Sequence, residues 1–286
     1  MSQTPIFHFG TVGSPRSTPA KPGGSVGAIL HLADQGLTAF ELGWVRSVRV
    51  SEETCLKIAQ TAKEAGVHIS VHAPYYINLN ADHEEWPRSR KRLMDASRFG
   101  HLAGATDIIF HPGSYFGGTP EKALEVAVPR LRGCIEELRF SGIMITLRPE
   151  TMGKGAMIGS LEDTLIFSKE IDGVEPCLDF AHLHARSGDG STNSYAEWCE
   201  LLTKYREALG IDAMQRLHCH LSGIEYGPKG ERNHLMLADS DFNLEDLLRA
   251  LNDLNCHGRI LCESPKDMDV DAQLIKSTWE RLSGKL

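Results

Sequence analysis

The feature of this chain that most restricts its fold is a repeated pattern of short apolar segments. Eight of them, rich in Ile, Val, Leu and Phe, occur at nearly regular intervals along the 286 residues. Continuous apolar runs of this length are typical of strands that are buried on both faces of a parallel sheet. We therefore expect strands over 6–10, 38–44, 68–73, 107–111, 143–149, 175–180, 216–221 and 259–263.

Helical patterns lie between these segments. The stretch 51–66 opens with a serine, keeps its apolar residues on one stripe and stops at a glycine, as a capped helix does. Asn243 is a residue type that caps helices, and Pro120 suits the first turn of its helix. The expected helices cover 51–66, 84–104, 119–142, 161–170, 194–209, 243–256 and 271–283.

Strand–helix alternation of this kind, without a break in composition, predicts a single (β/α)8 TIM barrel over residues 1–286. The alternative is an open, doubly wound sheet with a glycine-rich phosphate turn after its first strand. Pro15 follows Gly13 and Ser14 where the helix of that turn should begin. The barrel is therefore the favoured fold.

Composition narrows the class of protein further. With 41% hydrophobic and 24% charged residues, the chain has the make-up of a soluble globular protein. It has neither an apolar run long enough to span a membrane nor a leader pattern, so we expect a cytoplasmic protein without membrane contact. The seven cysteines form no CxxC pair and indicate reduced core thiols. The net charge of −8 argues against nucleic-acid binding through bulk surface charge, although bound cations would change this locally.

Six of the eight apolar segments carry a metal-competent side chain at or near the C-terminal end. An ionisable side chain in a buried strand is costly unless something pairs with it. In a barrel these strand ends, and the longer loops expected after strands three, five, six and seven, meet at one mouth. Histidine and carboxylate ligands without cysteine suit Zn²⁺, Mn²⁺ or Fe²⁺. The pattern predicts one polynuclear metal site built from His72, His111, Glu150, Asp179, His182, His218, His220 and Glu263.

Some of these assignments have alternatives. His218 and His220 are two residues apart and share a face of their strand, so one is expected to be a ligand and the other a supporting or substrate-contacting group. Asp179 and His182 converge only if the chain turns between them, and His184 is a further residue that could touch metal or substrate.

Glu150 and Glu263, the two glutamates at the ends of expected strands, also have a purely structural interpretation. Glu150 could pair with Arg148, two residues earlier in the same strand. Glu263 could pair with Lys266 in the turn that follows. In either case the carboxylate would be a salt-bridge partner and not a ligand.

At these residues the chain resembles the endonuclease IV family of apurinic/apyrimidinic endonucleases, which belongs to the xylose-isomerase-like TIM barrels. The similar pieces follow one another in the family order from the third strand to the C-terminus. They are SVHAPYYINL at 70–79, FHPGS at 110–114, Glu150 with its following threonine, LDFAH at 178–182, the strand of His218 with GPKGERNH at 227–234, and CESP at 262–265.

The resemblance implies two or three clustered metals per chain, usually zinc, with manganese as an alternative. The first metal would be bound by His72, His111 and Glu150. Glu150 would bridge to a second metal, and together with Glu263 it would be a catalytic carboxylate. The remaining ligands of the second metal would be Asp179, Glu263 and His218, or His220 in place of His218.

The residues available to bind the third metal depart from the family pattern. It would use His182 together with an acid and a histidine from the loop after the seventh strand. The family has Asp-x-His there, whereas this loop has Glu231 and then Asn233 at the position of the histidine. Glu231 can replace aspartate as an oxygen ligand, and His234 would have to act one residue later.

The family activity is hydrolysis of the DNA backbone at abasic sites, so the resemblance implies a hydrolase whose partner is double-stranded DNA with such lesions. Tyr75 matches an aromatic residue that the family inserts at the lesion. The other candidate DNA contacts are Tyr76, Arg46, Arg49, Lys229 and Arg232. As for its oligomeric state, we expect the protein to be a monomer.

A sugar or sugar-acid isomerase or epimerase on the same barrel is the main alternative. Such enzymes resemble this chain in the carboxylates and the seventh-strand histidine around one metal, and a small-molecule pocket could use Glu41. A non-catalytic relative that binds nucleic acid or a metabolite is a third possibility. Against the isomerase stand three histidines that a single-metal enzyme has no reason to keep together: His72, His111 and His182.

Overall fold

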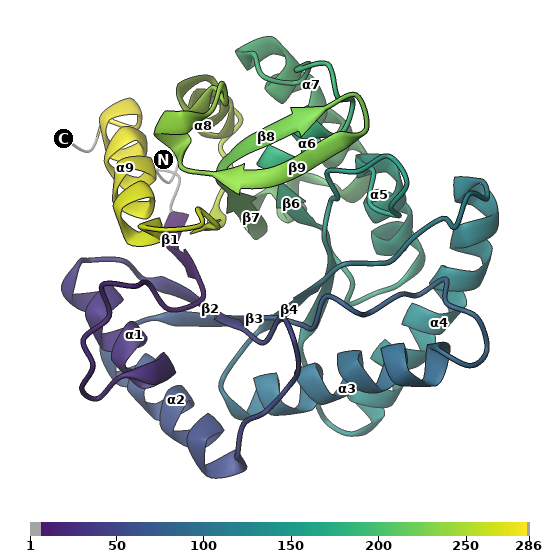
Figure 1. Cartoon of the computed structure of the whole chain (residues 1–286), viewed down its shortest axis with the longest axis horizontal. Helices are drawn as coiled ribbons and strands as arrows, with labels where there is room; N and C mark the ends of the chain where they lie inside the picture. Colours follow the sequence, from purple (N-terminus) through teal and green to yellow (C-terminus); the bar gives the residue numbers. More distant parts are fainter. Residues whose placement is uncertain (1–6, 285–286) are drawn as a thin grey trace.

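The computed structural model describes residues 7–284 and contains a barrel of eight parallel strands surrounded by helices (Figure 1). The strand order is β5-β4-β3-β2-β1-β10-β7-β6. The ring closes through two parallel bridges, from Leu147 to Val174 and from Glu150 to Cys177. The strands are β1 Phe7–Val12, β2 Ala39–Gly43, β3 His68–His72, β4 Asp107–Phe110, β5 Thr146–Pro149, β6 Cys177–Asp179, β7 Leu217–Leu221 and β10 Gly258–Cys262.

The predicted TIM barrel is thus confirmed, and every expected strand is found with its ends shifted by a few residues. The first expected strand began at Ile6, which lies outside the described residues. All seven expected helices are present as well. They are α2 Glu52–Ala65, α3 Trp86–Leu102, α4 Pro120–Phe140, α5 Leu161–Glu170, α7 Tyr195–Leu209, α8 Leu244–Asp253 and α9 Met268–Leu282.

The caps of these helices follow from local chemistry. The Ser51 hydroxyl accepts a hydrogen bond from the Thr54 amide at the start of α2, and Asn243 accepts one from the Asp246 amide at the start of α8. Gly66 ends α2 in the left-handed conformation.

Within residues 7–284, no helix is both long and apolar enough to cross a bilayer.

Two α-helices and a β-hairpin were not expected from the sequence. Helix α1 (Gly24–Asp34) follows Gly23, which supplies no side-chain cap, so the usual start signal is missing. Helix α6 (Phe180–Ala185) and a hairpin of β8 (Gly223–Gly227) and β9 (Gly230–Leu235) replace parts of two expected loops. Both of these elements lie at the C-terminal end of the barrel (Figure 1).

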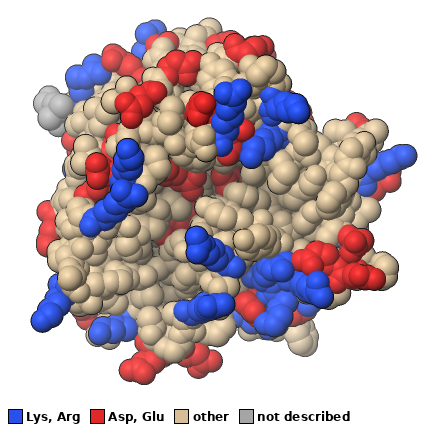
Figure 2. All heavy atoms as spheres, viewed as in Figure 1, with Lys and Arg blue, Asp and Glu red and all other residues tan. Residues whose placement is uncertain are grey.

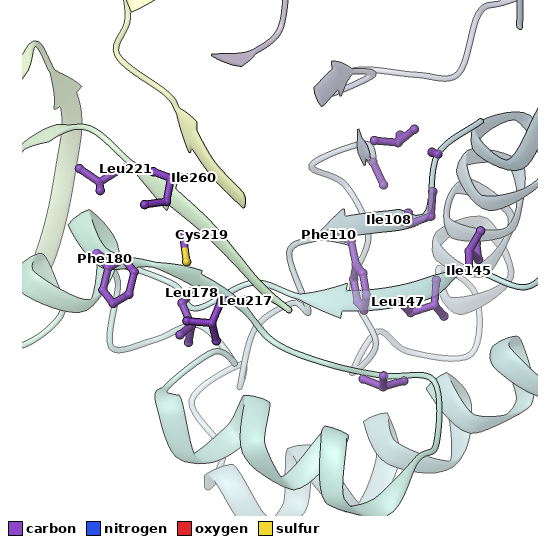
Figure 3. Packing of buried hydrophobic residues seen from close by; sticks show 14 of the residues in the cluster. Ile108, Phe110, Ile145, Leu147, Leu178, Phe180, Leu217, Cys219, Leu221 and Ile260 are labelled. Carbon is purple, nitrogen blue, oxygen red and sulfur yellow. The ribbon is translucent and has the colours of Figure 1, made fainter. Parts of the chain in front are cut away.

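The seventh strand shows how the barrel divides apolar and polar side chains. Leu217, Cys219 and Leu221 point outward into the hydrophobic core between strands and helices (Figure 3). Because side chains alternate along a strand, His218 and His220 point into the barrel, where both are buried. One strand therefore packs the outer core and also supplies the polar interior.

The lower, N-terminal end of the interior is filled by a buried ion-pair network. Arg148 donates from Nε to Asp107, and its other nitrogens donate to the carbonyls of Pro176 and Arg216 at 3.0 and 3.1 Å. Arg259 contacts the second Asp107 oxygen at 3.0 Å. The carboxylate partners of Arg148 are therefore Asp107 and Glu175, which leaves Glu150 to the opposite end of the barrel.

Candidate metal centre

Glu150 lies at the centre of a cluster formed where six strands end. It is completely buried. Its Oε2 atom is 3.2 Å from Nε2 of His72 and 3.4 Å from Nε2 of His111. These three residues come from β3, β4 and β5, and their donor atoms are close enough to surround one ion. The structure brings together the trio that was predicted for the first metal.

A second group of donors shares Glu150. The potential ligand atoms of Glu150, Asp179, His220 and Glu263 all lie within 4.8 Å of one another. Nδ1 of His220 is 3.4 Å from Glu263 and 3.6 Å from Glu150. His218 lies deeper in the barrel, with Nε2 2.9 Å from Glu41. Of the two histidines left open by the sequence, it is therefore His220 that joins the carboxylates at the strand ends.

The third group centres on His182. Its Nε2 atom is 3.2 Å from Nε2 of His234 and 3.5 Å from Glu231. Asp179 also belongs to this group, with Oδ2 3.4 Å from the Nδ1 atom of His182. Here Asp179 caps α6 by accepting from the His182 amide, so the chain turns between the two residues as required.

A β-bulge explains how His234, one residue later in the sequence than the family pattern, comes to face His182. Glu225 pairs with Asn233 and Tyr226 pairs with Glu231, so Arg232 is an extra residue in β9. The extra residue puts Glu231 and His234 on the same face, toward His182. Asn233 points the other way and donates to Glu225 at 3.1 Å.

Two glycines let the hairpin approach the loop after β5. The Glu231 amide donates to the Gly153 carbonyl at 2.8 Å. A Cβ atom at Gly230 would lie 2.1 Å from that carbonyl oxygen, and one at Gly153 would lie 2.6 Å from the Glu231 Cβ. Any larger residue at either position would therefore push Glu231 away from the cluster.

The donor set fits divalent cations. Nδ1 of His72 and Nδ1 of His182 each lie 2.9 Å from a backbone carbonyl, which leaves Nε2 of both rings free to bind a metal. Among the described residues, Glu150 Oε1, Asp179 Oδ2 and His220 Nδ1 are buried without a hydrogen-bond partner. Buried polar atoms of this kind are costly unless they are satisfied. Nitrogen and oxygen donors suit zinc, manganese or iron.

The cluster binds protons strongly when it lacks metal. Burial lowers the pKa of His72, but the adjacent Glu150 carboxylate outweighs burial and raises it to about 9. Burial also acts on His182, where Asp179 and Glu150 raise the pKa to about 10. For Glu150, burial favours the neutral acid, but the surrounding histidines, His111 first, keep its pKa well below the usual value. Protons on His72 and His182 thus occupy places that a cation would take.

We therefore expect metal loading at pH 7 to release protons. His72 and His182 are protonated below their raised pKa values and must lose these protons to become ligands. The release should decline as pH rises through about 9 and then about 10, because above these pKa values His72 and His182 are already neutral. Calorimetric titration with Zn²⁺ in buffers of different ionisation enthalpy measures the number of protons.

The titration is repeated with His182→Gln, which removes one of the two rings. His101→Gln is the matched control, because His101 lies exposed on α3. The first variant should release fewer protons and the second should behave like the wild type. Equal proton release by all three proteins would contradict the assignment of His182.

The cluster opens to solvent through a cavity of about 330 Å³. Tyr75 forms part of its wall and stacks on the ring of His111 at 4.9 Å. A neighbouring hollow of about 290 Å³ shares Tyr75, His234 and Glu263 and extends toward Gly13 and Gly43. A larger groove of about 720 Å³ lies between α4 and α5 and contains no residue of the cluster. The cluster therefore opens into the two neighbouring hollows, which together form one cleft, and not into the larger groove.

The other residues predicted to contact DNA lie at the surface of the protein. Figure 2 shows carboxylates in the central hollow and separate Lys and Arg side chains around it. Tyr76 is 63% exposed and lies beside the Arg92 guanidinium. Four basic residues proposed as DNA contacts are exposed: Arg46, Arg49, Lys229 and Arg232.

The structure does not bring His184 to the cluster. Its Nδ1 atom lies 3.1 Å from the Ser191 carbonyl and its Nε2 atom 3.2 Å from Asp241. Its ring packs edge-on against Tyr226 of the hairpin. These contacts tie α6 to the neighbouring loops, which is a structural role.

Two residues near the cluster have contacts that the sequence did not reveal. Ser222 directly follows β7, and its hydroxyl lies 2.9 Å from Nδ1 of His234. Its position at a strand end, two residues after His220, is the signal that could have drawn attention to it. Glu41 was considered for a small-molecule pocket, but it is completely buried beneath the cluster.

An eight-stranded parallel barrel with a buried histidine and carboxylate cluster at its C-terminal mouth defines a class of TIM-barrel proteins with donor groups that could hold metal ions. Within that class, the chain belongs to the xylose isomerase-like TIM barrel family, whose model matches residues 29–281. It is 35% identical over 283 residues to an uncharacterised protein of Methanocaldococcus jannaschii, a match that covers 99% of this chain and 100% of the relative.

More distant relatives carry functional names. The chain is 27% identical over 260 residues to endonuclease 4 of Thermus thermophilus, covering 87% of this chain and 90% of that protein. A crystal structure of endonuclease IV from the same species superposes with a TM-score of 0.70 at 22% identity and covers 97% of this chain and 100% of its own. A D-tagatose 3-epimerase-like protein gives 0.72 at 18% identity, covering 96% and 99%. The structural likeness therefore establishes the fold of this chain. It does not distinguish an endonuclease from an epimerase, because structures of both kinds superpose similarly well.

Proposed function

We propose that this protein is a metal-dependent phosphodiesterase, with two or three zinc ions, that cleaves the backbone of double-stranded DNA at abasic sites. The observation that carries the proposal is the sharing of Glu150 by neighbouring donor groups. Its two oxygens lie within 3.6 Å of four histidines: His72, His111, His182 and His220. A bridging carboxylate of this kind is what a cluster of several cations requires.

The arrangement suits phosphodiester hydrolysis. Divalent cations, when bound, supply Lewis acidity to a water and to the oxygens of the phosphate. The residues of the chain supply charge, restrict the approach of the substrate and attract the phosphate. Glu263 supplies a carboxylate to the lining of the cleft, Glu150 supplies one buried behind that lining, and Tyr75 in the wall restricts how a substrate can approach. Lys154 lines the cavity and is exposed, so its ammonium can attract a phosphate.

The surface around the cleft supports a polyanionic substrate in spite of the net charge of −8. Lys229 and Arg232 lie on the hairpin, and Arg46 and Arg49 follow β2. We expect a duplex laid over the mouth to bring a phosphate to the hollow that holds the carboxylates, with separate Lys and Arg side chains around it (Figure 2). Tyr75, 49% exposed, is the aromatic residue that we expect to enter the duplex.

A sugar epimerase is the second candidate, because one donor group is sufficient for a single metal. Glu150, Asp179, His220 and Glu263 could hold one cation without any other residue. This function would leave the pair of His72 and His111, and the pair of Glu231 and His234, without a purpose at the cleft. For that reason we favour the phosphodiesterase.

The test is incision of a DNA duplex that contains a single abasic analogue, together with a metal count by elemental analysis. We expect cleavage by zinc-loaded protein, loss of cleavage with a chelator, and two or three metals per chain. His111→Gln should lose activity, whereas His101→Gln on exposed α3 should not. A single bound metal with no incision, and with interconversion of ketose sugars, would overturn the proposal in favour of the epimerase.

A further inference from the structure

Glu41 is an ionisable residue in the barrel interior that the proposed chemistry does not use. It lies on β2, in register with Ser70 of β3, and is completely buried. It lines neither of the two hollows at the C-terminal mouth, so a substrate in the cleft does not touch it. A carboxylate is costly in this position unless its oxygens are well satisfied.

Three side chains surround the Glu41 carboxylate. The Ser70 hydroxyl donates to Oε2 at 2.7 Å, and Nε2 of His218 lies 2.9 Å from the same oxygen. These two contacts hold the carboxylate in one orientation. They leave Oε1 3.1 Å from the Nε2 atom of His220. Among the described residues neither of these two buried atoms makes an aligned hydrogen bond, so the contact is a close approach of two unsatisfied polar atoms, with His72 also nearby.

His220 therefore has carboxylates at both ring nitrogens. On its upper edge, Nδ1 faces Glu263 at 3.4 Å and Glu150 at 3.6 Å. On its lower edge, Nε2 faces only Glu41 among these acids. The His72 ring lies nearly parallel to that of His220, with an angle of 21° between the planes. His220 is thus held edge-on between the donor cluster and Glu41.

A neutral imidazole carries one proton, and the nitrogen that binds metal must be the other one. We propose that Glu41 is a positioning residue that retains the proton of His220 on Nε2 and so presents Nδ1 as a metal ligand. The proposal rests on the metal centre of the proposed function. Histidine ligands commonly donate their second N–H to a carboxylate, which orients the ring and makes it a stronger ligand. Glu41 would act through His220 and never contact the substrate.

The direct test measures the tautomer of His220 in the unmodified protein. Protein labelled with ¹⁵N-histidine is loaded with Zn²⁺, and long-range ¹H–¹⁵N correlations report which ring nitrogen bears the proton. We expect the proton of His220 on Nε2. A proton on Nδ1 would overturn the proposal, and this measurement does not depend on any variant folding.

The second test is the zinc affinity of Glu41→Gln, measured by competition with a chromophoric chelator. The amide keeps the shape of the side chain but loses its charge, so we expect binding about 10- to 100-fold weaker. Ser70→Ala is the matched control, because it removes one hydrogen bond to the carboxylate and leaves its charge and the His218 contact. It should weaken zinc binding much less than Glu41→Gln does.

The outcomes separate this inference from the function on which it rests. Wild-type affinity in Glu41→Gln, together with a lower unfolding temperature of the metal-free variant, would make Glu41 a residue of purely structural importance and overturn the inference alone. Failure of the wild-type protein to bind zinc at all would overturn the inference and the proposed function together.

Discussion

Glu150→Gln is expected to lower incision of an abasic duplex by on the order of a thousandfold and to remove metal from the protein at the same time. One Glu150 oxygen lies between His72 and His111, and the other faces His182 and His220. Glutamine retains a single neutral acceptor oxygen, so it can neither bridge two cations nor balance their charge.

The measurement combines steady-state incision with elemental analysis of the same preparation. Glu64→Gln, the same substitution on the exposed face of α2, is the control and should leave both quantities unchanged. A Glu150→Gln protein that kept its metals and its activity would show that Glu150 is not a bridging ligand. Circular dichroism of the variant verifies that the barrel has folded.

Asp107→Ala should have the largest effect on stability, lowering the free energy of unfolding by about 3–5 kcal/mol. The carboxylate accepts from Arg148 and contacts Arg259, and both Asp107 and Arg148 are almost fully buried, with exposed fractions of 5% and 4%. Removing it leaves Arg148 with Glu175 as its remaining carboxylate, at 3.3 Å. A buried cation that loses its main partner is far more costly than a broken surface pair.

Urea denaturation of the metal-free protein gives this free energy directly. Asp172→Ala serves as the comparison, since Asp172 pairs with Arg139 at the surface and its side chain is 93% exposed. Exposed pairs contribute little because water screens them. If the two alanine variants had similar stabilities, the network at the N-terminal end would not be the stabilising feature that its burial suggests.

The barrel was predictable because its signal is local and repeated. Each strand is an apolar run, and the seven expected helices lie between such runs or after the last of them, some with a capping residue such as Ser51 or Asn243. Helix α1 was not predicted, and it starts at two successive glycines without a capping side chain. The β8–β9 hairpin escaped because its sequence lacks a regular apolar alternation and is interrupted by the bulge at Arg232.

The candidate site was predictable in its composition and less so in its geometry. Strand ends that carry His72, His111 and Glu150 had to meet at one mouth of a closed barrel. The period of two along β7 placed His218 and His220 on the same inner face but could not distinguish them. Depth along the barrel axis separates the two, since His218 faces Glu41 and His220 reaches Glu263.

The sequence by itself determined the barrel and the set of donor residues at its mouth, because strand periodicity and position within a strand are properties of neighbouring residues. Tertiary structure alone decided which donors share an ion-sized space. The bulge at Arg232 aligns Glu231 with His234, and the network at Asp107 engages Arg148 and so leaves Glu150 available. These outcomes depend on distances between segments that are remote in the chain, and such distances are set only when the ring of strands closes.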